Sequence, residues 1–316
     1  MCGGRNNPDP VILFFVLGLL AGGAKSDLRL PEPIYKMLSI YLLVTIGLKG
    51  GVHLAEHAGW KLAGPVIAAV LLALLIPTFT YVVVKRWGGF SRDDAAALAA
   101  HYGSVSAVTF AVGQTFLDRL GLSYEAYLTL LVAVMEVPAI GLAVALARRG
   151  EGKTQWGPLV AEVLLNRSIF LLIGGVAIGA LAGHERLKPV EGFFFGGFKG
   201  ALALFLLEMG VLASQRLGDL RKVGGFLVGF GVLMPLFAGT LGAAAGSLAG
   251  LSLGGSTLLA ILAASASYIA APAACHIAIP KANPTVYLTA ALGVTFPFNL
   301  TVGIPIYHAL AKFFHG

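Results

Sequence analysis

Long apolar runs, separated by short polar or Pro/Gly-rich connections, cover nearly the whole chain. A helix needs roughly 20 apolar residues to cross a hydrocarbon core of about 30 Å, so each run is a candidate membrane span. The first run also resembles a signal-peptide core, but only Arg5 precedes it, and we expect a short first span. The pattern predicts ten spans, at 10–25, 33–48, 63–85, 94–116, 125–147, 159–182, 192–214, 223–248, 254–278 and 284–312.

Two of these spans are interrupted near the middle by small polar residues. Span 94–116 contains His101-Tyr102-Gly103-Ser104-Val105-Ser106, and span 254–278 contains Ser265-Ala266-Ser267-Tyr268. Lipid cannot satisfy the backbone groups that a broken helix exposes, so each break must face protein, water or a ligand.

The two halves of the chain share a pattern at an offset of about 160 residues. The matching pairs are Tyr127-Leu128-Thr129 with Tyr287-Leu288-Thr289, Ser104-x-Ser106 with Ser265-x-Ser267, Pro77 with Pro235, and Pro138 with Pro297. Spans rich in Ala, Gly and Leu also resemble one another without any repeat, and this is the alternative explanation. If the repeat is real, five spans per half make the second half enter the membrane in the opposite direction.

Inverted repeats with discontinuous helices at matching places are typical of secondary transporters. We therefore predict an all-α integral membrane fold of about ten transmembrane helices in two inverted five-helix repeats, residues 1–150 and 151–316. The fourth helix of each repeat is expected to be discontinuous.

Composition agrees with a membrane protein. Of the 316 residues, 57% are hydrophobic and 12% are charged, about half the charged share of a soluble domain. The net charge of +7 does not indicate nucleic acid binding, because the Lys and Arg lie in short connections between apolar runs. More of them fall on the side of connection 148–158 than on the side of the termini, so both termini are predicted outside. Cys2 and Cys275 are too few for a disulfide framework or a metal cluster.

Hydroxyl side chains gather at both breaks, where half-helix N-termini offer free N–H donors and partial positive charge. A small anion between the two ends would be bound by dipoles, since only His101 among basic residues lies beside a break. Alternatively, these side chains join helices by hydrogen bonds. The candidate anion-binding residues are Ser104, Ser106, Ala107, Thr109, Ser265, Ser267, Tyr268 and Ala270.

Acidic residues within predicted spans are functional candidates, because burying them in a bilayer is costly. Glu136 lies mid-span before Pro138, and its counterpart in the second half is Thr295 or Phe296, with Asn299 close by. Carboxylate, amide and hydroxyl oxygens suit Na⁺, so these three residues are candidate ion ligands. A proton-carrying or structural Glu136 is the alternative. For Glu208 we expect a structural role, paired with Lys199.

One motif suggests a different function. His53-x-x-Glu56-His57 matches the spacing of inverted zinc peptidases. It follows Gly50-Gly51 in a predicted extracellular loop and has no obvious third ligand, which favours a solvated loop over a hydrolase.

Several stretches, in order along nearly the whole chain, resemble the sodium-dependent bicarbonate transporters, the SbtA-like permeases. They are Ile46-Gly47-Leu48-Lys49-Gly50-Gly51, Gly103-Ser104-Val105-Ser106, Met135-Glu136-Val137-Pro138-Ala139, Ile279-Pro280-Lys281-Ala282-Asn283-Pro284 and Gly303-Ile304-Pro305. The resemblance implies two inverted repeats, a core domain against a gate domain, and a homotrimer. It also implies Na⁺-coupled bicarbonate import by an elevator-like movement, with the anion between the two broken helices and Na⁺ in place of any cofactor.

Residue by residue, the resemblance assigns Ser106, Thr109, Ser265 and Ser267 to binding positions and Glu136 to an acidic position. The chain departs from well-known members where they read Ser-Ser-Ser-Asp and it reads Ser265-Ala266-Ser267-Tyr268, which leaves the Na⁺ stoichiometry open. Its connection between the halves is shorter, which leaves binding of the family's PII-like regulatory partner open.

We therefore expect a secondary active transporter of the plasma membrane, not an enzyme, importing bicarbonate with Na⁺. The alternatives are a transporter of another small anion, proton coupling through Glu136, and an intramembrane zinc hydrolase built on His53, Glu56 and His57. A structural or receptor role would leave the protein without ion flux.

Overall fold

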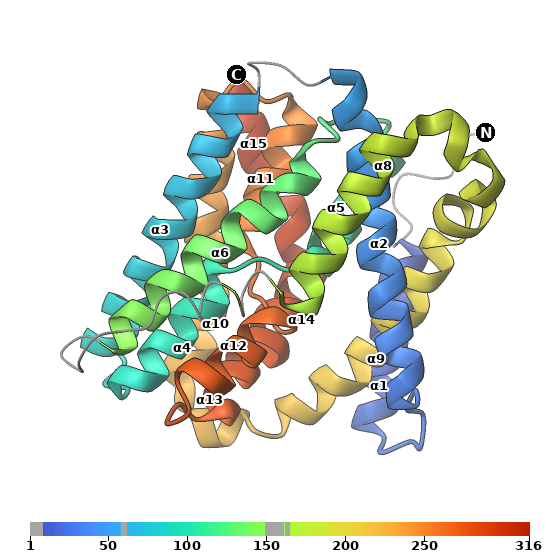
Figure 1. Cartoon of the computed structure of the whole chain (residues 1–316). Coiled ribbons are helices and arrows are strands. Elements are labelled where there is room, and N and C mark those ends of the chain that lie inside the picture. Colours follow the sequence, from blue (N-terminus) through green and yellow to red (C-terminus); the bar gives the residue numbers. More distant parts are fainter. Residues whose placement is uncertain (1–8, 58–61, 149–160, 162–164) are drawn as a thin grey trace.

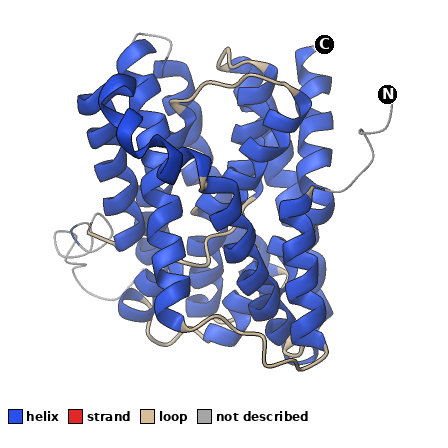
Figure 2. Cartoon of the chain, turned by 90° about the vertical axis from the view of Figure 1, so that its right-hand side faces the viewer, coloured by secondary structure: helices blue, strands red, loops and turns tan. Residues whose placement is uncertain are grey.

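The computed structural model describes residues 9–57, 62–148, 161 and 165–316, and it contains no strand within these ranges (Figure 2). Seven of the described helices are long and apolar enough to cross a membrane, which makes the chain a multi-pass membrane protein. Arg5 and Cys2 lie outside the described residues, as does the connection 148–158 apart from Arg148.

The helices follow the predicted spans in order (Figure 1). The first half contains α1 Pro10–Gly23, α2 Glu32–His57, α3 Ala63–Arg86, α4 Arg92–Gly103, α5 Ala107–Leu120 and α6 Leu128–Ala147. The second half contains α8 Arg167–Glu191, α9 Phe198–Leu217, α10 Leu220–Leu248, α11 Leu253–Ala264, α12 Ala270–Ala278, α13 Pro284–Leu288, α14 Phe296–Phe298 and α15 Ile304–His315. Three π-helical segments interrupt it: η2 Gly192–Gly196, η3 Thr289–Thr295 and η4 Asn299–Gly303.

One predicted boundary was wrong, and another lies outside the described residues. The second span does not end at residue 48, because α2 continues to His57, so the expected extracellular loop around His53 is helical. The predicted start of the sixth span, residue 159, lies outside the described residues, and α8 begins at Arg167, where Asn166 caps it by accepting a hydrogen bond from Ser168 N. Asparagine is a strong N-cap, which explains why the helix begins there.

The helices pack in two groups (Figure 1). The first group pairs α2 with α8 and α1 with α9. The second group contains α3, α4, α6, α10, α11 and α15, in which α3 contacts α4 and α10 contacts α11. Most of the buried hydrophobic residues form one cluster that reaches into both groups.

Glycines allow the helix pairs of the first group to approach closely. A Cβ on Gly47 would lie 2.6 Å from the carbonyl oxygen of Leu172, and one on Gly18 would overlap Leu207 of α9. Small residues four apart are typical of tight membrane helix pairs, and both pairs use them: Gly47 and Gly51 face Gly175 and Gly179, while Gly18 and Gly22 face Gly210 and Ser214.

Both predicted breaks are present. The helix ends at Gly103 and resumes at Ala107, and it ends again at Ala264 and resumes at Ala270. Ser104 and Ser265, the residues after the first half-helices, share an extended backbone, with ψ of 162° and 159°. In Figure 1, α4 lies below α5 whereas α11 lies above α12, so the two broken helices run in opposite directions.

Hydrogen bonds to a carboxylate connect the start of each first half-helix, α4 or α11, to the opposite half of the chain. Asp94 of α4 accepts a 2.7 Å hydrogen bond from Asn283 N, which belongs to the other half of the chain. Glu125, before α6, accepts hydrogen bonds from Ser252 N at 2.7 Å and Ser252 Oγ at 3.0 Å, and Ser252 is the N-cap of α11. Each broken helix is therefore fixed by a residue of the opposite half.

Candidate functional site

A cavity lies where the two breaks meet the first group of helices. It contains about 350 Å³ of space not occupied by atoms, including the part open to solvent. Its lining comes from α2, both breaks, α5, α6, α8 and α12: Leu43, Val105, Ser106, Ala107, Val132, Glu136, Ser168, Leu172, Ser267, Tyr268, Ile269 and Ala270. The cavity therefore has one wall in each group of helices.

The N-termini of both second half-helices open into this cavity, through Ala107 of α5 and Ala270 of α12. At α5, Thr109 N donates to Ser106 Oγ and Phe110 N donates to Ser106 O. The first four N–H groups of a helix have no partner within it, so Ala107 and Val108 keep donors that the cap does not use. At α12, Ala271 N donates to Ser267 Oγ at 3.2 Å.

Hydrogen bonds join the two breaks. Ser106 N donates to Ser265 Oγ at 2.8 Å, and that hydroxyl donates to Leu262 O at 2.8 Å. In the other direction, Ser267 N donates to His101 O at 2.8 Å. These bonds hold the half-helix ends at a fixed separation, which a preformed anion site requires.

The structure separates the predicted anion residues into two kinds. Ser106, Ala107, Ser267, Tyr268 and Ala270 line the cavity. The others support it. Ser265 joins the breaks, Thr109 Oγ1 donates to Ser106 Oγ at 3.0 Å, and Ser104 Oγ donates to Glu136 Oε1 at 3.2 Å.

The three candidate Na⁺ ligands have different hydrogen-bond partners. Glu136 is buried and lines the cavity. Thr295 hydrogen-bonds Tyr102 Oη and donates to Gly231 O, both at 2.7 Å. Asn299 Nδ2 donates to Ala264 O at 2.8 Å, and Asn299 Oδ1 accepts from Tyr307 Oη at 2.6 Å. Thr295 and Asn299 thus contact residues at the C-terminal ends of α4 and α11, and neither is among the residues that line the cavity.

The sequence did not indicate that Ser168 lines the cavity. Ser168 is 8% exposed, and its hydroxyl has no hydrogen-bond partner among the described residues. The hydroxyl of Tyr268 is in the same state, although it lies close to Ser106. In the sequence, Ser168 stands two residues after the helix-capping Asn166, in the first turn of a helix. Nothing in that position indicates that the side chain lines a cavity.

No Lys, Arg or His is among the residues that line the cavity, whereas the carboxyl group of Glu136 is. An anion there would be bound by N–H and O–H dipoles, with a cation or a proton to offset Glu136.

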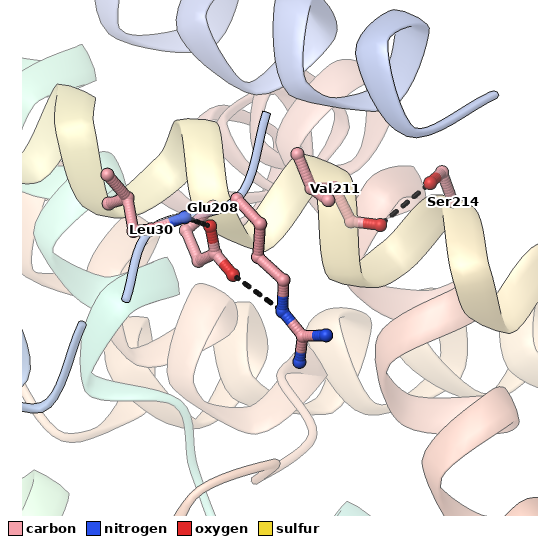
Figure 3. A network of polar contacts seen from close by, with 5 residues as sticks. Leu30, Glu208, Val211 and Ser214 are labelled. Atoms are coloured by element: carbon pink, nitrogen blue, oxygen red, sulfur yellow. Dashed lines mark hydrogen bonds and ion pairs between the residues drawn. The ribbon is translucent and has the colours of Figure 1, made fainter. Parts of the chain in front are cut away.

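Glu208 has a structural role, as expected, but its predicted partner was wrong. Instead of pairing with Lys199, its carboxylate accepts a 2.7 Å hydrogen bond from Leu30 N and lies 4.0 Å from Arg29 Nε (Figure 3). It ties the segment between α1 and α2 to α9, at a site separate from the cavity-lining set.

The His53 motif lies partly outside the described residues. Within the described part of the chain, no three His, Cys, Asp or Glu side chains gather to hold a metal ion. His53 is exposed near the end of α2, and the side chains of Glu56 and His57 are outside the described set.

Comparison with protein families matches residues 10–312 to a family described as the Na⁺-dependent bicarbonate transporter superfamily. No curated protein matches the chain. Membership of this family supports a sodium-dependent bicarbonate transporter rather than an enzyme, with Na⁺ as a coupling ion and no cofactor indicated. The match covers nearly the whole chain, and the protein belongs to the Na⁺-dependent bicarbonate transporter superfamily.

Proposed function

We propose that the protein is a secondary active transporter that imports bicarbonate with Na⁺, and that the anion binds in the cavity between the two breaks. The observation that carries this proposal is that Ala107 and Ala270, at the N-termini of two half-helices from opposite halves of the chain, line one cavity. Such ends are ready-made anion sites, and two of them facing one space can hold a small oxyanion without a basic side chain.

The helix pairings support two inverted repeats, residues 1–150 and 151–316. The contact of α2 with α8 has its counterpart in the contact of α9 with α1. Within the second group, the contacts of α3 with α4 and α6 correspond to those of α10 with α11 and α15. We assign the group of α1, α2, α8 and α9 to a gate domain and the other group to a core domain.

An elevator-like movement would carry the anion with the core domain. The cavity has walls in both groups, so sliding one group against the other would open it first to one side and then to the other. The close glycine contacts within the gate domain favour a rigid support for this movement.

For Na⁺ we propose two positions. Glu136 in the cavity would bind a cation beside the anion, with Ser104 orienting the carboxylate. Thr295 and Asn299 offer oxygens near the C-terminal ends of α4 and α11, where carbonyl groups and the helix dipole favour a cation. Their present partners are protein groups, so a cation there would have to displace hydrogen bonds.

The resemblance also leads us to propose a homotrimer in the plasma membrane with both termini outside, and a PII-like regulatory partner. Native mass spectrometry in detergent tests the assembly, and a mass of one or two copies would exclude the trimer.

The function is tested by uptake of labelled bicarbonate into liposomes that contain the purified protein. We expect uptake with an inward Na⁺ gradient and none when K⁺ replaces Na⁺. Equal uptake in both buffers would remove Na⁺ coupling, and dependence on a pH gradient alone would support proton coupling. Strong competition by acetate, sulfate or nitrate would instead indicate another anion.

A further inference from the structure

Two buried hydroxyl groups lie in the wall of the cavity, and that of Tyr268 lies close to the side chain of Ser106. Tyr268 is 9% exposed and Ser168 is 8% exposed, and neither hydroxyl has a hydrogen-bond partner among the described residues. Both residues line the cavity. An unpaired buried hydroxyl is destabilising, so its persistence in a cavity indicates a group that pairs with it at another stage.

Each hydroxyl is held in place by other parts of its residue. The ring of Tyr268 packs edge-on against Phe296 at a centroid distance of 4.9 Å, and Phe296 in turn packs against Phe15 at 5.4 Å. The backbone of Ser168 is fixed by its N–H bond to Asn166 Oδ1 at 3.0 Å. The ring of Tyr268 and the backbone of Ser168 are therefore positioned before any ligand arrives.

The two hydroxyls belong to opposite walls. Tyr268 lies in the second break, beside the N-terminus of α12, whereas Ser168 lies on α8 in the other group of helices. Leu43, Leu172 and Ser168 are the cavity residues from α2 and α8, so Ser168 is the polar contribution of that wall to the lining set.

We propose that Tyr268 and Ser168 are specificity-determining residues, whose hydroxyls donate hydrogen bonds to different oxygens of the transported anion. The inference rests on the proposed function, because it takes this cavity as the anion site. Donors on opposite walls fit an oxyanion whose oxygens point in several directions, such as bicarbonate. Ser168 then binds the anion only while the two groups of helices enclose it. Its hydrogen bond to the anion therefore depends on the enclosed arrangement of the two groups.

The test compares bicarbonate uptake by reconstituted wild type, Tyr268→Phe and Ser168→Ala at saturating Na⁺. Each change removes one hydroxyl with little change in shape. A hydrogen bond to a charged group is lost in each, so we expect the KM for bicarbonate to rise about tenfold. The half-saturating Na⁺ concentration and the thermal midpoint should stay at the wild-type values.

Thr80→Val is the matched control, because Thr80 is a fully buried, equally unpaired hydroxyl that does not line the cavity. Its KM should equal that of the wild type. Ser168→Cys keeps the size of the side chain and provides a second variant if Ser168→Ala does not fold. An unchanged KM in both hydroxyl variants, or an equal rise in Thr80→Val, overturns the inference while the transport function stands. Absence of bicarbonate uptake by the wild type overturns the proposed function and this inference together.

Discussion

Glu136 is the acidic side chain among the residues that line the cavity, and its carboxylate accepts a hydrogen bond from Ser104. Ser104 Oγ donates to Oε1 at 3.2 Å, at the long end of the hydrogen bonds around the breaks. A carboxylate beside an anion site is repulsive unless a cation or a proton offsets it. The residue therefore connects the identity of the coupling ion to the binding of the anion.

We expect Glu136→Gln to raise the half-saturating Na⁺ concentration about tenfold. The amide keeps the size of the side chain and the bond from Ser104 but removes the negative charge that attracts the cation. The measurement is bicarbonate uptake as a function of Na⁺ concentration at constant pH. Glu185→Gln serves as control, because Glu185 is exposed and paired with Lys188. Loss of pH dependence in the variant, with unchanged Na⁺ dependence, would identify Glu136 as a proton carrier instead.

Among individual residues, the sequence indicated cavity-lining residues that recur in both halves of the chain. It did not indicate those that occur in one half alone. Ser106 and Ser267 were found because each recurs beside a break. Ser168 has no such signal, and only the packing of α8 against the breaks brings it into the cavity. Thr295 and Asn299 were grouped with Glu136 by the repeat offset, yet their hydrogen bonds place them beside Tyr102 and Ala264.

Among the elements, α2 and α8 form a close helix contact that substitution of glycine can probe. A Cβ on Gly175 would lie 2.8 Å from Val44 O and 3.1 Å from the Cα of Gly47. The neighbouring Gly174 has no atom of another residue within 4 Å of the same position. Alanine substitutions at these two adjacent positions therefore distinguish the effect of helix–helix packing from that of helix propensity.

Gly175→Ala should destabilise the protein by about 1–3 kcal/mol, since the added methyl group forces two backbones apart. Gly174→Ala should be neutral or slightly stabilising, because alanine is the better helix former and the position is open. Thermal unfolding in detergent measures both. Equal midpoints for the two variants would contradict the close packing of α2 and α8.

Helix positions followed from apolar runs, but helix ends and irregularities did not. Hydropathy placed the second span at 33–48, whereas the less apolar continuation to His57 also folds as helix. The segments Thr289–Thr295 and Asn299–Gly303 are π-helical within the tenth span, where Thr295 and Asn299 make tertiary hydrogen bonds. Such local changes depend on partners from distant parts of the chain, which no window of sequence contains.

For the whole molecule, the arrangement depends on contacts between the halves. Ser106 bonds Ser265, His101 bonds Ser267, and Asp94 and Glu125 each hold a residue of the opposite half. The repeat offset predicted that the breaks correspond, and the structure brings them together. The division into two groups of helices was implied by the family resemblance and could not be derived from hydropathy, because apolar runs do not specify which helices pair.

The central claim is that the N-terminus of α5 donates a backbone N–H to the anion. Proline at the first position of a helix removes that donor and preserves the helix, and the extended backbone of Ser106, with φ of −107° and ψ of 108°, accepts a following proline. Ala107→Pro therefore tests one N–H group. Ala107→Val adds similar bulk and keeps the N–H.

The decisive measurement is the KM for bicarbonate of these two variants in liposomes at saturating Na⁺. We expect the KM of Ala107→Pro to rise about tenfold or more beyond any change in Ala107→Val, with similar thermal midpoints. A folded Ala107→Pro protein that takes up bicarbonate with the same KM as Ala107→Val would contradict it.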